Sequence, residues 1–169
     1  LDQINFVHKG RQRHATLVST LPGSDLALLV ADTSNQKPIR MTPWLQTNSQ
    51  IWAIGFPLGG PQVAAGGRVE AYEDGDIQTN ASVNHGQSGG GLVGCENGEH
   101  VLAGMIRAYG AIQDGNRLIR LDDYSVSVPA EIIAGFLDNT RVSASVLERF
   151  LLSSNSSASF SGDDLVAAR

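Results

Sequence analysis

A serine stands among glycines in the run Gly86-Gln87-Ser88-Gly89-Gly90-Gly91. Glycine lets the backbone bend sharply and lets a substrate carbonyl approach without hindrance. The same bend can direct the backbone N–H groups of Gly86 and Ser88 toward one point. A hydroxyl nucleophile beside two converging N–H donors is the minimum apparatus for acyl transfer, because the donors stabilise the oxyanion. The residue types therefore predict a nucleophile at Ser88 on a tight, exposed turn.

Asp25 is the second residue whose type and place predict chemistry. It follows the turn Pro22-Gly23-Ser24 and precedes an apolar run, residues 26–31, that predicts a buried strand. A carboxylate that enters a core needs a partner to offset its desolvation. In a serine triad the partner is the imidazole that the acid orients, and Asp25 before Ser88 fits the chain order His, Asp, Ser. A plain role at the start of a strand is the alternative for Asp25.

Short strands and frequent turns must position these two residues. Apolar segments predict about ten strands, and one helix opens at Pro129, where proline suits the first helical position. The expected strands cover residues 4–7, 14–19, 26–31, 51–55, 63–72, 77–83, 91–94, 101–108, 117–121 and 125–128. This pattern favours a sandwich or barrel over alternating β/α units. Trp44 and Trp52 are expected in the core.

Composition restricts the partners and the setting of the protein. The chain has 169 residues, enough for one compact domain or two small barrels. A net charge of −5 without any basic run argues against nucleic acid as a partner. No apolar stretch reaches the roughly 18 residues that span a membrane. The single cysteine, Cys95, is expected to be buried or half-buried. Because one cysteine cannot form an intrachain disulfide, the sequence favours the bacterial envelope or cytoplasm over a disulfide-rich extracellular setting.

No metal or cofactor is expected from the remaining motifs. The pairs Gly59-Gly60 and Gly66-Gly67 do not precede a helix with Lys-Ser/Thr, so they do not match a phosphate-binding loop. The acidic turn of residues 73–76 is interpreted as the solvated tip of a hairpin, with a cation site as the less favoured alternative.

Several segments, in their order and spacing, resemble one family. They are Asp25-Leu26-Ala27-Leu28-Leu29, then residues 51–59 and then residues 79–92. With them the chain resembles the trypsin-like serine proteases of the HtrA/Deg type. Residues 102–106 and 124–137 are similar to the family's strand after the serine loop and to its closing strand and helix. The resemblance covers roughly residues 2–140.

The resemblance implies an all-β fold, a double β-barrel of trypsin/chymotrypsin type with a C-terminal helix and the active site in the cleft between the barrels. Residues 1–45 are then the remainder of an N-terminal barrel that is incomplete in this chain. Residues 46–140 are the C-terminal barrel with its closing helix, and residues 141–169 are a helical segment and a serine-rich tail.

The resemblance also implies roles for individual residues. Ser88 is the nucleophile and Asp25 the triad acid, and the N–H groups of Gly86 and Ser88, with Gln87 between them, form the oxyanion hole. The substrate side-chain pocket is expected to be lined by Ser82, Val83, Arg107, Ala108 and Tyr109. Ser82 favours small or medium apolar substrate side chains; an acidic preference assisted by Arg107 is the alternative. His85 is expected either in solvent or against the pocket or oxyanion loop.

The catalytic histidine of the family is the main departure, since family spacing places it before Leu1. The positions of His8, His14, His85 and His100 do not fit its role. We expect an upstream segment of the same protein to supply this histidine and the first strands of the first barrel. Gly91, where the family usually has proline, is expected to change little.

The sequence thus predicts a serine endopeptidase that acts on peptide or protein substrates through an acyl-enzyme on Ser88. Two alternatives stay open: a catalytically inactive protease-like module that binds peptides or partners, and, less favoured, a viral or phage-type processing protease. The residues just before Leu1 discriminate between enzyme and module, because a Thr/Asn-x-His-Val stretch there favours the enzyme. The resemblance also favours a homo-oligomer.

Overall fold

The computed structural model describes residues 3–32 and 36–140, which fall into two compact units. The described residues of the first unit are 3–32, 36–38 and 136–140, and those of the second are 39–135. The first unit contains an antiparallel sheet and the second contains a closed barrel. No helix in residues 3–32 and 36–140 is long and apolar enough to cross a bilayer.

The sheet of the first unit has the order β1 (Gln3–His8), β2 (Arg11–Leu21) and β3 (Leu26–Ala31). A tight turn joins β1 to β2 through two residues with positive φ, Lys9 and Gly10, as hairpin turns require. A short 3-10 helix, η1 (Pro22–Ser24), leads into β3. Within the described residues, β1 and β3 each pair with one strand only, so both are edge strands.

The prediction that β3 is a buried strand is wrong. Only Leu26 is buried, and Leu29 is 39% exposed. A run of apolar residues indicates a strand, but a strand is buried on both faces only where other layers cover both faces of its sheet. In the described part of the chain this sheet has three strands, and β3 lies at its edge.

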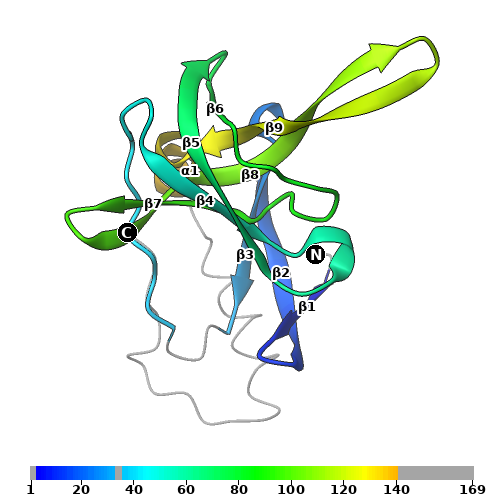
Figure 1. Ribbon diagram of the computed structural model, residues 1–169. Helices are drawn as coiled ribbons and strands as arrows, with labels where there is room; N and C mark the ends of the chain where they lie inside the picture. Colours follow the sequence, from blue (N-terminus) through cyan, green and yellow to red (C-terminus); the bar gives the residue numbers. More distant parts are fainter. Residues whose placement is uncertain (1–2, 33–35, 141–169) are drawn as a thin grey trace, which may run out of the picture. The chain divides into compact units, whose positions relative to one another are not determined.

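The barrel of the second unit closes in the order β4-β5-β6-β9-β8-β7, with every neighbouring pair antiparallel. Figure 1 shows these strands, with α1 directly after β9. The bounds are β4 (Gln50–Gly55), β5 (Val63–Glu73), β6 (Asp76–Thr79), β7 (Gly91–Glu96), β8 (Glu99–Asp114), β9 (Arg117–Pro129) and α1 (Ala130–Asn139). A second 3-10 helix, η2 (Pro57–Gly59), follows β4. The all-β fold with one late helix is confirmed.

Strands β8 and β9 run past the rest of the barrel as a long hairpin (Figure 1). The sequence predicts two strands at 117–121 and 125–128. The structure has one strand, β9, over both segments, but β8 pairs with residues 117–120 and 125–129 and its register shifts between Tyr109 and Ala111, opposite residues 121–124. The predicted strand 77–83 ends at Thr79. Asn80 then binds Arg68 through both its backbone N–H and its side-chain oxygen, and the chain leaves the barrel toward the serine turn.

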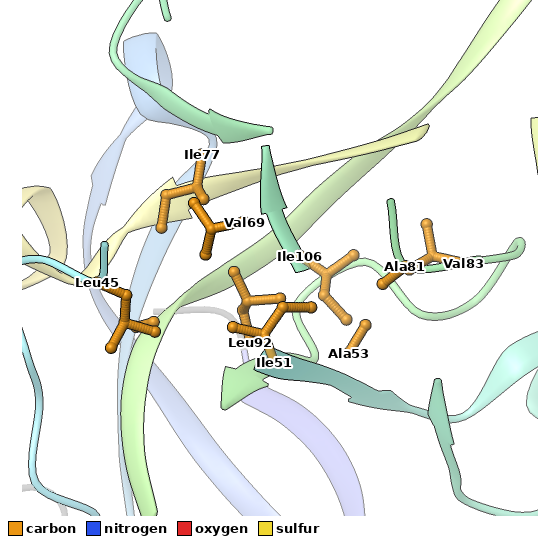
Figure 2. Packing of buried hydrophobic residues seen from close by; sticks show 10 residues of the cluster. Leu45, Ile51, Ala53, Val69, Ile77, Ala81, Val83, Leu92 and Ile106 are labelled. Atoms are coloured by element: carbon orange, nitrogen blue, oxygen red, sulfur yellow. The ribbon is translucent and has the colours of Figure 1, made fainter. Parts of the chain in front are cut away.

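Alternation of inward and outward residues builds the barrel core. In β4, Ile51 and Ala53 have no exposed surface, whereas Trp52 between them is half-buried. The core cluster, drawn in Figure 2, comprises Leu45, Ile51, Ala53, Val69, Ile77, Ala81, Val83, Leu92, Ala103 and Ile106. The expectation that both tryptophans lie in the core is therefore wrong. Trp52 faces outward by the period of the strand, and Trp44, 56% exposed, stacks on Tyr72 at 3.9 Å between ring centroids.

Cys95 is exposed, which corrects its predicted burial. It lies in β7, next to the buried Val93 and Gly94, and pairs with His100 across the β7–β8 hairpin. The boundaries at residues 45 and 140 stay predictions, and the predicted helical segment and serine-rich tail at 141–169 lie outside the described residues.

Replacing Ile77 with alanine tests the barrel core. The Ile77 side chain is fully buried, so loss of transfer energy and creation of a cavity add. We expect Ile77→Ala to lower the free energy of unfolding by about 2–5 kcal/mol. Ile119→Ala, at a side chain that is 44% exposed in the β8–β9 hairpin, is the matched control and should cost less than about 1 kcal/mol. Urea unfolding followed by tryptophan fluorescence measures both; equal losses would contradict the assignment of the core.

Candidate active site

The serine turn occupies residues 84–90, between the end of β6 and the start of β7. Gln87 organises it: its N–H donates to the Asn84 carbonyl at 3.1 Å, and its carbonyl accepts from Gly90 N–H at 2.9 Å. The Gln87 side chain is buried, and its Oε1 accepts from the Asn84 N–H at 2.7 Å. These bonds close a compact turn on which Ser88 is exposed.

Strand β8 binds the C-terminal part of this turn through backbone hydrogen bonds. Gly89 N–H donates to the Ile106 carbonyl, and Ile106 N–H donates to the Gly90 carbonyl, both at 2.8 Å. The Ser88 hydroxyl donates to the carbonyl of the next β8 residue, Arg107, at 3.2 Å. The backbone on both sides of Ser88 is therefore part of the barrel's hydrogen-bonded framework.

The near side of the turn packs against the η2 loop, and this contact requires glycine at position 86. Gly86 has a φ of +87°, and a Cβ there would lie 2.9 Å from both Leu58 N and Phe56 O. Leu58 N–H also donates to the His85 carbonyl at 2.6 Å. A side chain at position 86 would thus be strained by its φ and would collide with backbone atoms.

Two backbone donors beside Ser88 have no acceptor in the described part of the chain. Within the described residues, neither Gly86 N–H nor Ser88 N–H donates a hydrogen bond. Both residues line a hollow of about 450 Å³. The other residues that line it are Ile39, Ile54, Gly55, Phe56, Gln62, Gln87, Gly89, Gly90, Gly91, Val93 and Leu102. A carbonyl oxygen that accepted from both N–H groups would be stabilised as an oxyanion, and the oxyanion hole at Gly86 and Ser88 stays a prediction.

Asp25 lies in the other compact unit, at the junction of η1 and β3. Its φ is +54°, and its N–H donates to the Pro22 carbonyl at 3.1 Å. Asp25 itself is exposed, so the expectation of a carboxylate entering a core is wrong; the buried residue at this point is Leu26. Its pairing with a histidine and Ser88 stays a prediction.

The residues predicted to line the substrate pocket lie on two segments of the barrel unit, one before the serine turn and one in β8. Ser82 and Ala108 are exposed and Tyr109 is half-buried. Val83 is 3% exposed and belongs to the core cluster, so its side chain fills the barrel interior. None of these residues lines the hollow beside Ser88.

Arg107 presents its carbonyl, not its side chain, to the serine turn. Its guanidinium forms an ion pair with Asp76 at 2.7 Å, and the Asp76 side chain is only 11% exposed. Burial raises the pKa of the Asp76 carboxyl above its ordinary value, while the nearby Arg107 acts in the opposite direction and Asp74 adds to the rise. The Arg107 charge is therefore committed to the barrel, which weakens the hypothesis of an Arg107-assisted acidic preference.

Two side-chain contacts lie beside the serine turn; the first agrees with the alternative that places His85 against a predicted pocket residue, and the second was not predicted from the sequence. Tyr109 Oη and His85 Nε2 lie 2.7 Å apart, and the two rings meet edge to face with centroids 5.1 Å apart. Arg120 Nη1 donates to the Val83 carbonyl at 3.3 Å. Arg120 lies on β9, and nothing in the sequence marks it as a partner of Val83. His85 is marked only by its place next to the serine turn. In residues 3–32 and 36–140, no group of His, Cys, Asp and Glu side chains could hold a metal ion.

Comparison with known families gives one match. A family model described as a trypsin-like peptidase domain matches residues 3–105. No curated protein matches the chain.

Solved structures of proteases share this fold. The active form of the Rv3671c protease from M. tuberculosis aligns with a TM-score of 0.68 at 22% identity, covering 84% of this chain and 65% of that one. A serine endoprotease from Yersinia pestis gives 0.67 at 24% identity, over 82% and 48%. The HtrA-type protease AlgW with a decapeptide gives 0.67 at 27% identity, over 88% and 45%. The chain thus spans about half to two thirds of the length of these proteins.

The Asp76 carboxyl makes a prediction about stability and pH. Because its pKa is raised in the fold above the ordinary 3.8, the folded state holds the proton more tightly than the unfolded chain does. The contribution of Asp76 to the free energy of unfolding therefore falls as pH rises from below the ordinary pKa through the raised pKa of the folded state. The stability of Asp76→Asn relative to the unmodified chain should rise over the same interval, measured by urea unfolding at each pH.

Asp123→Asn, at an exposed position of β9, removes the same formal charge and corrects for the change in overall charge. If the stability difference between Asp76→Asn and Asp123→Asn does not move with pH, or moves in the opposite sense, the raised pKa of Asp76 is wrong.

Proposed function

Because this chain belongs to the trypsin-like peptidase family, we propose that it carries the nucleophile of a serine endopeptidase, Ser88. The observation that carries the proposal is the serine turn itself. An exposed hydroxyl lies beside two backbone N–H groups that have no acceptor within the described residues, and all three border one hollow. Such donors stabilise charge that develops during acyl transfer and need no rearrangement at the moment of reaction.

In the proposed mechanism, Ser88 Oγ attacks the carbonyl carbon of a substrate peptide bond while its proton passes to a histidine. That histidine comes from an upstream segment of the same protein, and Asp25 orients it. The Gly86 and Ser88 N–H groups hold the oxyanion of the tetrahedral intermediate. The intermediate collapses as the histidine gives its proton to the leaving amine, and an acyl-enzyme forms on Ser88. Water, deprotonated by the same histidine, then releases the acid and regenerates the hydroxyl.

The supports of the turn explain how the oxyanion site keeps its geometry. The bonds of Gly89 and Gly90 to Ile106 fix one end, and the bond from Leu58 N–H to the His85 carbonyl fixes the other. Because that carbonyl is occupied, the peptide between His85 and Gly86 directs its N–H away from the η2 loop. This arrangement favours a preformed oxyanion site over one that assembles only with substrate.

A binding module without catalysis is the second candidate. One observation favours it: in the described part of the chain the Ser88 hydroxyl donates to the Arg107 carbonyl, not to a histidine. A serine without a base still binds peptides through its N–H donors but does not cleave them.

Labelling with a fluorophosphonate tests the enzyme against the module, because the probe reacts only with an activated serine. We expect Ser88 to be labelled when the chain is expressed together with its upstream segment, and Ser88→Ala to abolish labelling. Ser82→Ala removes an equally exposed serine and is the control for non-specific reaction. Absence of labelling with the upstream segment present would exclude the peptidase and favour the module.

Asp25 is tested by its isosteric amide. Asp25→Asn keeps the shape but removes the charge that orients and stabilises the histidine, so kcat should fall on the order of 10⁴-fold. Asp32→Asn, in the same unit just after β3, is the control and should stay within a few-fold of the unmodified protein. Measured hydrolysis that survives Asp25→Asn at full rate would assign the triad acid elsewhere.

A further inference from the structure

An exposed tryptophan of the barrel unit is held in a fixed orientation. Trp44 is 56% exposed, and one face of its indole stacks on Tyr72, with ring centroids 3.9 Å and ring planes 18° apart. The Tyr72 hydroxyl accepts from the Leu45 N–H at 3.0 Å and donates to the Leu45 carbonyl at 3.1 Å, and Leu45 belongs to the core cluster. Because Tyr72 is fixed in this way, a ligand on the open face of the indole meets a side chain that is already ordered.

Trp44 and Tyr72 line a hollow of about 210 Å³, and the apolar part of its lining is completed by Pro43, Pro129 and Ile132. Sites for small molecules and cofactors usually have roughly 300–1,000 Å³, so this hollow suits one side chain of a larger partner better than a cofactor. Tryptophan is also enriched among the residues that dominate the energetics of protein interfaces. The hollow therefore has the character of a small docking site.

The rest of the lining is acidic. It consists of Gly75 and four carboxylate residues, Glu73, Asp74, Asp76 and Glu131. Asp74 and Glu131 are exposed and form no ion pair within the described residues. Burial raises the pKa of Asp76, and the charge of Asp74 adds to that rise, so the two carboxylates repel one another. A positive charge that enters the hollow relieves this repulsion.

The chemistry of the lining selects the kind of cation. In the part of the chain that the structure describes, no group of carboxylates and other ligand side chains could hold a metal ion. A guanidinium or ammonium group brings its own N–H donors to carboxylates and is attracted to the face of an indole. We propose that this hollow docks a basic segment of a partner protein, in which an arginine or lysine flanked by apolar residues lies against the open face of Trp44.

This docking site is separate from the proposed active site. The hollow at Trp44 and the hollow beside Ser88 have no lining residue in common. Binding at Trp44 therefore needs neither the serine nor a histidine, and it can be measured on the chain whether or not the chain cleaves peptides.

The test compares two peptides by isothermal titration calorimetry: acetyl-Gly-Leu-Arg-Leu-Arg-Gly-amide, and the same peptide with citrulline in place of both arginines. Citrulline keeps the length and the shape of arginine but carries no charge. We expect the arginine peptide to bind roughly tenfold tighter or more, because its cation gains both the carboxylates and the indole face. Its affinity should also fall as the salt concentration rises.

Variants of the lining separate the indole from the carboxylates. Trp44→Ala should weaken binding of the arginine peptide by roughly tenfold or more. Asp74→Asn combined with Glu131→Gln should weaken it several-fold and reduce its salt dependence; asparagine tolerates the φ of +53° at position 74. Phe56→Ala is the matched control, since Phe56 is 55% exposed but lines the hollow beside Ser88, and it should leave the affinity unchanged.

Each outcome supports or overturns the proposal. Equal affinity for the two peptides, or binding of neither, overturns it without any variant. Binding that is lost with Phe56→Ala and kept with Trp44→Ala assigns the peptide to the other hollow and overturns it as well. If circular dichroism shows that Trp44→Ala is unfolded, the combined carboxylate variant decides. Self-association of the chain alone in sedimentation velocity, abolished by that combined variant, would assign the hollow to a second copy and contradict a separate partner.

Discussion

The pair of hydrogen bonds that joins the serine turn to β8 is the constraint on which the site depends. Gly89 and Gly90 share both backbone bonds with Ile106, whose side chain lies in the barrel core. The position of Ser88, the proposed nucleophile, is therefore set by the same packing that holds the barrel together. A site built on a strand in this way keeps its geometry more accurately than one carried by a free loop, since core packing resists displacement.

Close backbone approach is the complementary constraint, and it explains the glycines around Ser88. A Cβ at Gly90 would lie 2.3 Å from the Ile54 carbonyl, and one at Gly86 would meet the η2 loop at 2.9 Å. The glycines of the turn therefore serve packing: they let β4, the η2 loop and the turn approach one another closely.

The interior of the barrel explains why the residues predicted to line a substrate pocket differ from one another. Val83 directs its side chain into the core, and Arg107 directs its charge toward Asp76 on β6. Only Tyr109, which packs on the core and still reaches His85, joins interior and site. Neighbouring residues of β8 therefore make different contacts, because successive side chains of a strand point to opposite faces. The bulge at Arg107 changes the direction of its side chain further.

Much of this protein could be read from the sequence, because local patterns carry it. Apolar segments bounded by Gly, Asn and Asp placed nearly every strand and the helix after Pro129, and the glycine-serine run marked the turn. The burial of individual side chains was predicted less accurately from the sequence. Strand β3, Trp44 and Cys95 are more exposed than their residue types indicate, because burial depends on what covers a strand and not on the strand's own composition.

What the sequence by itself determined is the identity of the chemical groups and the order in which they occur: a serine among glycines, an aspartate before a strand, and a family resemblance that joins them. The tertiary structure alone decided which groups meet. Three contacts illustrate this. His85 and Tyr109 are 24 positions apart in the sequence, and Val83 and Arg120 are 37 apart. Arg107 and Asp76 lie on different strands of the barrel. Such pairings follow from strand register and barrel closure, which depend on the packing of the whole chain and leave no local trace in the sequence.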